Sequence, residues 1–367
     1  MDAALLINSE FWNDPSPLVL GEISHLPELA AHVFFETSGS SGTPKWVALS
    51  KQALIVSASA VNTHLEVMPN SCWGLALPLN HVGGFGVVAR AYQAGCGFQH
   101  FDRRWNALAF CEWLARHGIT HTSLVPTQVH DIVKANLTAP AAVIAIVVGG
   151  GHLDESLGQA ARDLGWPVLA SYGMTEAGSQ IATQGLDSLG MPYRASPIPL
   201  LPIWEAQITH DKLLAISGPA LFTGYLVAGV FVPRETSWHA TTDRVILEGR
   251  ALSILGRSDS LVKILGELVD PEAIECELLS LSQGQLTPGS FAVIAIPDAR
   301  AGNVLVPLFE SSVHPSIIQS TLSLYEDRTP GHKRLIPAAI LEEFPRSALG
   351  KLRRRELAAI YQNQIAP

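Results

Sequence analysis

The sequence predicts an α/β fold with a large N-terminal domain, a small β-rich subdomain and a smaller α+β C-terminal domain. Three observations support this prediction. Strand-like apolar runs alternate with helical patterns from residue 30 to about 175, which is the order that builds parallel sheets. Residues 185–255 lose the helical period and carry prolines among short apolar runs, which indicates short strands and turns. After Gly256 a polar break leads into a C-terminal part with both helical and extended patterns.

The N-terminal domain contains clear strand and helix signals. Residues 31–35 are a short apolar run, and residues 46–49 look extended. Residues 141–148 form a run of eight apolar residues that ends in a triple-glycine turn. Asp154 then provides an N-cap for a helix that runs through Asp163. We therefore expect a strand, a glycine turn and a helix in that order.

The C-terminal part begins at the polar run Arg257-Ser258-Asp259-Ser260. Beyond it the patterns indicate a helix at Pro271–Leu281 and a strand at 292–296. We place an N-terminal domain at 1–256, a connection at 257–260 and a C-terminal domain at 261–367.

Length and composition limit the class of protein. The chain has 367 residues, of which 47% are hydrophobic and 16% charged, so it can bury large cores and favours two domains over one. The 24 basic residues against 33 acidic residues give a net charge of -9 without any long basic run. This balance argues against a nucleic-acid binder or a membrane-surface binder.

Cysteine usage and hydropathy indicate the compartment. The four cysteines form no C-x-x-C pair and no disulfide framework, which favours the reducing cytoplasm. The N-terminus has no basic region before its first apolar run, so we expect no secretory signal. Twenty residues from Leu213 to Val232 lack charge, but Ser217-Gly218-Pro219 and Thr223-Gly224-Tyr225 interrupt them. Turns and short strands are therefore expected there instead of a membrane span.

A loop rich in small residues follows the strand at 31–35. Its backbone N–H groups can converge on an anion, its hydroxyls add donors, and Lys45 supplies a cation, which is typical of polyphosphate binding. It is not a Walker A loop, because Pro44 intervenes and an extended segment follows in place of a helix. The expected phosphate-binding residues are Thr37, Ser38, Gly39, Ser40, Ser41, Gly42, Thr43 and Lys45.

Three other motifs are weaker. Residues 84–89 match the dinucleotide fingerprint G-x-G-x-x-A, but the residues before them make a poor central strand. The loop at 39–43 lacks the G-x-S-x-G spacing of a hydrolase nucleophile. His117 and His121 have a helical spacing but are separated by Gly118 and have no adjacent glutamate, so a metal site is disfavoured.

Further motifs follow the phosphate loop in a fixed order. They are Gly149-Gly150-Gly151, Ser171-Tyr172-Gly173-Met174-Thr175-Glu176, Thr241-Thr242-Asp243, the stretch from Gly256-Arg257-Ser258-Asp259 through Lys263-Ile264-Leu265-Gly266 to Glu275, and Pro345-Arg346-Ser347-Ala348-Leu349-Gly350-Lys351. With the loop, this series resembles the adenylate-forming superfamily of acyl-CoA synthetases, peptide-synthetase adenylation domains and luciferases. The resemblance covers essentially the whole chain, and it implies that superfamily's fold with a mobile C-terminal domain.

Each motif also suits the chemistry of carboxylate activation, in which an anionic acyl oxygen attacks the α-phosphorus of anionic ATP. Glu176 is a hard oxygen ligand suited to Mg²⁺, and Tyr172 offers an aromatic face to adenine. The glycines at 149–151 let the backbone approach the purine. Asp243 can accept hydrogen bonds from ribose hydroxyls, and Arg257 can donate to them.

The resemblance implies further roles. Thr175 would contact the adenylate phosphate, and Lys351 would reach the α-phosphate and the substrate carboxylate. Asp259 would be the hinge about which the C-terminal domain turns between two half-reactions, and Lys263 and Gly266 would line the tunnel for the CoA thiol. The full set of expected nucleotide-site residues outside the loop is Gly149, Gly150, Gly151, Ser171, Tyr172, Gly173, Met174, Asp243 and Arg257.

Within the superfamily, residues 77–84, 123–128 and 172–181 most resemble the 2-succinylbenzoate–CoA ligases of menaquinone and phylloquinone synthesis. The resemblance implies that ATP and CoA are co-substrates and Mg²⁺ a cofactor. Because the acid is a dicarboxylate, one carboxylate reacts while the other needs a fixed cation. Arg90, alone in an apolar run, matches the position of that cation, and a surface helix cap is its alternative role. His81 would lie near the acyl pocket.

The chain departs from the superfamily pattern at three places. Only 36 residues precede the phosphate loop, so we expect an N-terminal subdomain to be largely missing. Thr242 stands where glycine is usual, and Ser260 stands where a second hinge acid is usual. The alternatives are a ligase or carrier-loading domain for another aromatic or short acid, or a non-catalytic nucleotide-binding regulator. A homo-oligomer is left open.

Overall fold

The computed structural model describes residues 2–21, 23, 27–37, 45–347, 350 and 352–364. The chain folds into two compact units. Unit 1 comprises residues 1–241 and 245–254, and unit 2 comprises residues 242–244 and 255–367.

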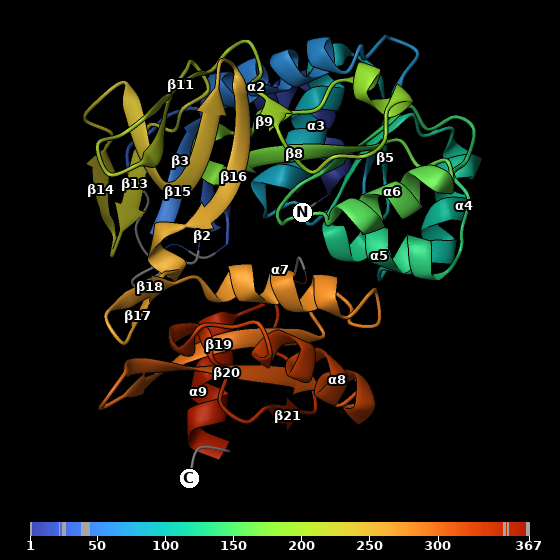
Figure 1. The fold of residues 1–367 in the computed structure, drawn as a ribbon. Helices are drawn as coiled ribbons and strands as arrows, with labels where there is room; N and C mark the ends of the chain where they lie inside the picture. The colour runs from blue at the N-terminus through green and yellow to red at the C-terminus, as the bar shows by residue number, and fades with distance from the viewer. Residues whose placement is uncertain are drawn as a thin grey trace. The chain divides into compact units, whose positions relative to one another are not determined.

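A six-stranded sheet forms the centre of unit 1 (Figure 1). Its strand order is β5-β4-β6-β7-β8-β9; the first five strands are parallel and β9 is antiparallel to β8. Buried residues on these strands, such as Trp73, Ile146 and Leu169, belong to one large hydrophobic core. The alternation of strands and helices predicted from the sequence is therefore confirmed. The strands are β4 (Cys72–Leu75), β5 (Gly97–His100), β6 (His121–Leu124), β7 (Ala145–Val148), β8 (Val168–Met174) and β9 (Ser179–Thr183).

Short polar side chains begin several of the helices of unit 1. Ser50, Asn106 and Asp154 each accept a hydrogen bond from a backbone N–H in the first turn of α2, α4 and α6. The predicted Asp154 cap and its helix to Asp163 are thus confirmed. The helices are α1 (Ser9–Asn13), α2 (Lys51–His64), α3 (Val82–Ala94), α4 (Ala107–His117), α5 (Pro126–Lys134) and α6 (Glu155–Asp163), with 3-10 turns η1 (Ala3–Ile7), η2 (Thr175–Ala177) and η3 (Leu186–Gly190).

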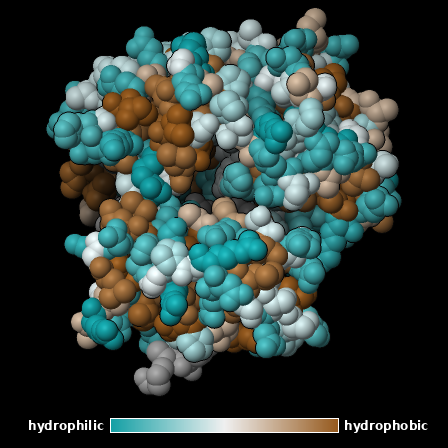
Figure 2. All heavy atoms as spheres, in the orientation of Figure 1, coloured by the Kyte–Doolittle hydropathy of each residue, from teal (hydrophilic) through white to brown (hydrophobic). Residues whose placement is uncertain are grey.

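Two five-stranded sheets complete the β structure of unit 1. One has the order β1-β2-β3-β13-β14 and the other β10-β16-β15-β12-β11. Their strands are β1 (Leu18–Leu20), β2 (His32–Thr37), β3 (Lys45–Ser50), β10 (Ile198–Pro199), β11 (Glu205–Ile208), β12 (Leu213–Ser217), β13 (Gly224–Val227), β14 (Val230–Pro233), β15 (Trp238–Glu248) and β16 (Ala251–Arg257). The expected β-rich region at 185–255 is present. Hydrophobic side chains remain at the surface of the β13–β14 hairpin, where Val227, Val230 and Val232 are exposed (Figure 2).

Unit 2 is an α+β unit with its own cores. The sheet β19-β20-β21 packs between buried side chains such as Leu278 and Tyr325 on one side and Leu357 on the other. The predicted helix at Pro271–Leu281 is α7, where Asp270 caps its first turn. The elements are η4 (Ser258–Ser260), β17 (Val262–Ile264), β18 (Glu267–Val269), α7 (Pro271–Leu281), β19 (Phe291–Asp298), β20 (Gly302–Glu310), α8 (Pro315–Glu326), η5 (Gly331–Lys333), β21 (Ala339–Leu341) and α9 (Arg354–Gln364).

One sequence expectation changes in detail. The strand predicted at 141–148 begins only at Ala145, because the chain turns after Pro140, whose carbonyl accepts a hydrogen bond from the N–H of Val143. The G-x-G-x-x-A match at 84–89 lies inside α3 and not at a strand-to-helix turn, which agrees with its rejection as a dinucleotide site. Over the described part of the chain, no helix is long and apolar enough to cross a membrane, and the run from Leu213 to Val232 forms short strands.

Candidate active site

Lys45, Glu176 and Tyr225 form a polar cluster in unit 1. The Lys45 Nζ lies 3.5 Å from Glu176 Oε1 and 4.0 Å from the centroid of the Tyr225 ring. The Tyr225 hydroxyl donates a hydrogen bond to the same Oε1 at 3.0 Å. Burial raises the pKa of Tyr225 well above its ordinary value, and the Glu176 charge adds to this, so the hydroxyl stays protonated and keeps donating.

The strand pair β2–β3 presents the two ends of the phosphate loop. Thr37 pairs with Lys45 in the antiparallel register, and the Thr37 Oγ1 donates to the Lys45 carbonyl at 3.1 Å. The two residues that bracket the loop are therefore adjacent. The predicted phosphate ligands Ser38, Gly39, Ser40, Ser41, Gly42 and Thr43 lie outside the described residues.

The ends of β7 and β8 bring the glycine turn beside the Ser171–Glu176 motif. Parallel pairing of Val148 with Ala170 places both carboxyl ends at one edge of the sheet, so Gly149–Gly151 and the following motif lie at that edge. Gly173 sits at a β-bulge, where an added Cβ would lie 1.6 Å from the Ser179 carbonyl oxygen. Only glycine allows β9 to approach this closely. The Ser171 Oγ lies 2.8 Å from the Thr183 Oγ1, which ties β8 to β9.

The carboxylate of Glu176 is suited to a divalent cation. It lies in η2 directly after Thr175 and Met174, its side chain is 14% exposed, and both of its described side-chain contacts fall on Oε1. One hard oxygen beside phosphate groups is the usual protein contribution to a Mg²⁺ site. No group of three or more His, Cys, Asp or Glu side chains that could hold a metal ion occurs among the described residues.

Arg90 is a buried cation without a carboxylate partner in the described part of the chain. Its side chain comes from α3 and is 2% exposed. It donates to the hydroxyls of Ser123 on β6 at 3.1 Å and Ser179 on β9 at 3.2 Å, and it lies 5.1 Å above the Trp73 ring. The alternative role as a surface helix cap is therefore wrong.

The charge of Arg90 is not balanced by these neighbours. Burial lowers the pKa of Arg90 to about 9, yet the guanidinium still carries its proton at neutral pH. A buried cation held only by neutral hydroxyls is costly, and it is a strong candidate to receive an anion. Ser179, one of the two hydroxyls that Arg90 contacts, is three residues from Glu176 in the chain.

His81 precedes α3 and occupies its N-cap position without a side-chain capping bond. Burial lowers the pKa of this imidazole, which makes the neutral form dominant at pH 7. The residue lies nine positions before Arg90 on the same segment.

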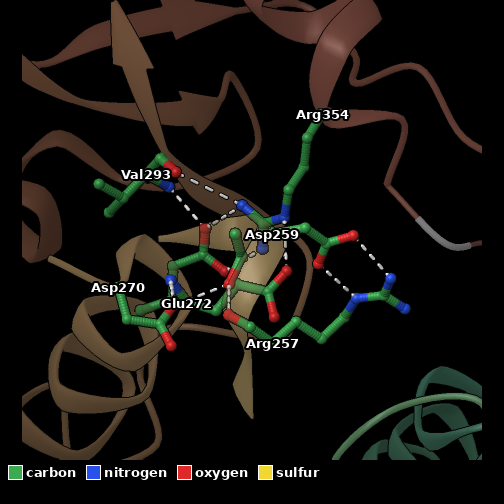
Figure 3. Close-up of polar contacts among 8 residues, drawn as sticks. Arg257, Asp259, Asp270, Glu272, Val293 and Arg354 are labelled. Atoms are coloured by element: carbon green, nitrogen blue, oxygen red, sulfur yellow. Dashed lines mark hydrogen bonds and ion pairs between the residues drawn. The ribbon is translucent and has the colours of Figure 1, made fainter. Parts of the chain in front are cut away.

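Asp243, Arg257 and Asp259 belong to unit 2. Arg257 donates to both Asp259 oxygens at 2.8 Å, a bidentate pair that Figure 3 shows. These hydrogen bonds lower the pKa of Asp259 and raise the pKa of Arg257. The negative charge of Asp243 also raises the pKa of Arg257. The predicted hinge acid is thus the partner of the predicted ribose-binding arginine.

The remaining predicted residues of unit 2 lie on a hairpin and near the C-terminus. Lys263 is exposed on β17, and Gly266 has a φ of +92° in the turn between β17 and β18. Lys351 lies outside the described residues.

The contacts of Ser123, Ser179 and Tyr225 with the site could not be predicted from the sequence. The two serines were parts of motifs, but nothing local to either one shows that both face Arg90. Tyr225 was treated as a turn residue, and its role arises because β13 pairs with β3 and sets Tyr225 opposite Val47, two residues after Lys45.

Comparison with known proteins places this site in a family. Residues 24–226 match the family described as AMP-binding enzyme, and the chain belongs to that family. Its sequence is similar to those of 2-succinylbenzoate–CoA ligases, and the predicted adenylate-forming superfamily and its fold are confirmed.

The relatives include the 2-succinylbenzoate–CoA ligase of Escherichia coli, 32% identical over 65% of this chain and 50% of its own length. The Bacillus cereus ligase of the same name is 27% identical over 89% of this chain and 69% of its own length. The chain thus spans about half to two thirds of the length of these relatives. Bacillus subtilis o-succinylbenzoate CoA synthetase, solved with its acyl-adenylate, is 25% identical with a TM-score of 0.74, covering 89% of this chain and 68% of that one.

Proposed function

We propose that the protein activates 2-succinylbenzoate with ATP and transfers the acyl group to CoA, giving 2-succinylbenzoyl-CoA, AMP and pyrophosphate. The observation that carries this proposal is Arg90, a buried cation that two serine hydroxyls hold and no described carboxylate neutralises. A second carboxylate on the substrate would supply the missing charge. In a monocarboxylic acid the one carboxylate reacts with ATP, and no second carboxylate remains to pair with Arg90. The relatives named as 2-succinylbenzoate–CoA ligases support the same substrate.

In the first half-reaction, a carboxylate oxygen of the acid bonds to the α-phosphorus of ATP and pyrophosphate leaves. Lys45 places a positive charge at one end of the phosphate loop, and Thr175 would contact the adenylate phosphate. Glu176 would hold Mg²⁺, with Tyr225 and Lys45 fixing its Oε1. When bound there, Mg²⁺ would neutralise negative charge on the phosphate groups.

We propose that Tyr172 and the glycines at 149–151 receive the adenine, and that Asp243 and Arg257 bind the ribose. Lys351 would stabilise charge on the α-phosphate and the reacting carboxylate. In the second half-reaction the CoA sulfur bonds to the acyl carbon and AMP leaves. Lys263 and Gly266 would line the thiol path, and residues 257–260, with Asp259 as pivot, would be the hinge between domains 1–256 and 261–367.

His81 would lie beside the acyl group, where burial keeps it neutral. The four cysteines form no C-x-x-C pair in the sequence, which suits a reducing compartment, and we propose the cytoplasm.

The test is pyrophosphate release by purified protein with Mg·ATP and each of four acids: 2-succinylbenzoate, benzoate, 2-hydroxybenzoate and a medium-chain fatty acid. We expect sustained release only with 2-succinylbenzoate and CoA together. Sustained release with a monocarboxylic acid and not with the diacid would contradict the proposed substrate while keeping the reaction class.

A further inference from the structure

A buried amide on a neighbouring helix contacts Arg90 at its backbone. Asn62 belongs to α2 and is 5% exposed. Its Nδ2 donates to the Arg90 carbonyl at 2.9 Å and to Gln93 Oε1 at 2.7 Å. Arg90 and Gln93 both belong to α3. Asn62 therefore holds the part of α3 from which the Arg90 side chain extends.

The same amide also holds the aromatic ring beside the guanidinium. Trp73 on β4 is fully buried, and its Nε1 donates to Asn62 Oδ1 at 3.1 Å. The Arg90 guanidinium lies 5.1 Å from the centroid of this ring. The face of an indole ring attracts a cation, and this attraction depends on where the ring lies. Asn62 thus contacts Arg90 directly at its backbone and indirectly through Trp73.

Gly86 leaves the space that the guanidinium occupies. It lies four residues before Arg90 in α3, so the two residues share one face of the helix. A Cβ added to Gly86 would lie 3.0 Å from Arg90 Nη2 and 3.4 Å from the Ser179 Oγ. These two atoms form the hydrogen bond of 3.2 Å between Arg90 and Ser179. A methyl group at position 86 would therefore press on the guanidinium at this contact.

We propose that Asn62 and Gly86 are positioning residues that fix the Arg90 guanidinium for the second carboxylate of the acid. This inference rests on the proposed function, in which Arg90 pairs with that carboxylate. Neither residue touches the acid in this role, and both act through Arg90. The pairing of a guanidinium with a carboxylate depends on distance and direction, so a displaced guanidinium binds the second carboxylate less well. A change at either residue should therefore lower the preference for a diacid while adenylation itself continues.

Gln184 provides a matched control for Asn62. It is a buried amide, 6% exposed, whose Oε1 accepts from the N–H of Ala170 at 2.8 Å and whose Nε2 donates to the Arg194 carbonyl at 2.6 Å. The described contacts of Arg90 do not include any of these three residues. Gln184→Met therefore removes a buried amide of the same kind that has no link to Arg90.

The experiment compares the diacid with an ester that lacks the second charge. We measure kcat/KM for 2-succinylbenzoate and for the monomethyl ester that keeps the reacting carboxylate, with saturating Mg·ATP and CoA. Wild-type protein should prefer the diacid, because only the diacid pairs with Arg90. We expect Asn62→Leu and Gly86→Ala to lower the diacid-to-ester ratio about 5- to 50-fold, mainly through a higher KM for the diacid, with the KM for ATP within about twofold of wild type.

Two comparisons distinguish positioning from general damage to the fold. Alanine is favoured over glycine in a helix interior, so Gly86→Ala should unfold at a temperature close to that of wild type, and it carries the test if Asn62→Leu does not fold. Gln184→Met should lower Tm but change the diacid-to-ester ratio by less than about twofold. In an Arg90→Met background, Asn62→Leu and Gly86→Ala should leave the ratio within about twofold, because the group that they position is gone.

The inference is overturned if the variants at positions 62 and 86 lower kcat/KM for the diacid and the ester alike. It is also overturned if Gln184→Met lowers the ratio as much as they do, or if they lower it equally without Arg90. Wild-type protein that converts the ester as well as the diacid, or converts neither, would instead overturn the proposed function, and this inference with it.

Discussion

Replacing Arg90 by methionine should make the protein more stable and inactive. Arg90 is 2% exposed, and burial moves its pKa from 12.5 to about 9, which corresponds to a cost on the order of 5 kcal/mol for keeping the charge in the folded state. Methionine removes that cost but loses two hydrogen bonds to serine hydroxyls and the contact with the Trp73 ring. We expect a net gain of about 1–2 kcal/mol in the free energy of unfolding.

Thermal unfolding followed by tryptophan fluorescence measures this gain, with an expected rise in Tm of about 2–6 °C. Pyrophosphate release with 2-succinylbenzoate should fall at least a hundredfold, since a buried charge pair with the second carboxylate is lost. Arg162 is the control, because it also lies 5.1 Å above an aromatic ring, that of Tyr193, but donates to the backbone carbonyls of Val168, Ser188 and Met191. Arg162→Met should lower Tm. A loss of stability for Arg90→Met equal to that of Arg162→Met would refute the reasoning, because Arg90 would then be a structural arginine.

Three further predictions follow from single contacts. Tyr225→Phe removes the donor to Glu176 and should lower the adenylation rate about fivefold and raise the Mg²⁺ concentration needed for half-maximal rate; unchanged Mg²⁺ dependence would contradict the contact's role. His121 is fully buried and its pKa is lowered by desolvation, so the unfolded state binds a proton more readily, and the free energy of unfolding should fall as pH drops below about 6.5. His121→Asn should reduce this pH dependence of the free energy of unfolding, measured by urea titrations at several pH values. An unchanged pH dependence would contradict the role of His121. Gly173→Ala forces a Cβ against the Ser179 carbonyl and should lower the free energy of unfolding by about 1–3 kcal/mol, measured by the same titrations; a neutral change would mean that β9 shifts freely.

Much of the fold follows from local sequence patterns. The helix at Pro271–Leu281 has the bounds that its proline start and apolar spacing predict, and Asp154 caps the helix that follows the glycine turn. The strand at 141–148 was predicted too long, because apolar residues at 141–144 satisfy a turn as well as a strand. Hydropathy alone cannot separate these cases.

The site is less local, and sequence reasoning recovers only part of it. The motifs predict Glu176 as a metal ligand and Arg90 as a cation for a carboxylate, because the side chains themselves have the charge that each role needs. The hydroxyl pair around Arg90 comes from β6 and β9, which are 56 residues apart in the chain and meet Arg90 only through the sheet order. Tyr225 reaches Glu176 across 49 residues through pairing of β13 with β3. Such groups become visible only when the strands are placed.

Two ion pairs within unit 2 show the same limit. Arg346, Arg354 and their acidic partners are separated by 36 and 79 residues, and nothing in the sequence pairs them. These pairs form only through the packing of β20, α7 and α9 within unit 2.

The most direct test of the central claim is analysis of the products by mass spectrometry after incubation with Mg·ATP, 2-succinylbenzoate and CoA. We predict AMP and 2-succinylbenzoyl-CoA in equal amounts, and acyl-adenylate on the protein when CoA is omitted. Formation of ADP in place of AMP would contradict the proposed reaction. Intact 2-succinylbenzoate and ATP, under conditions in which the protein converts another acid of the panel, would contradict the proposed substrate.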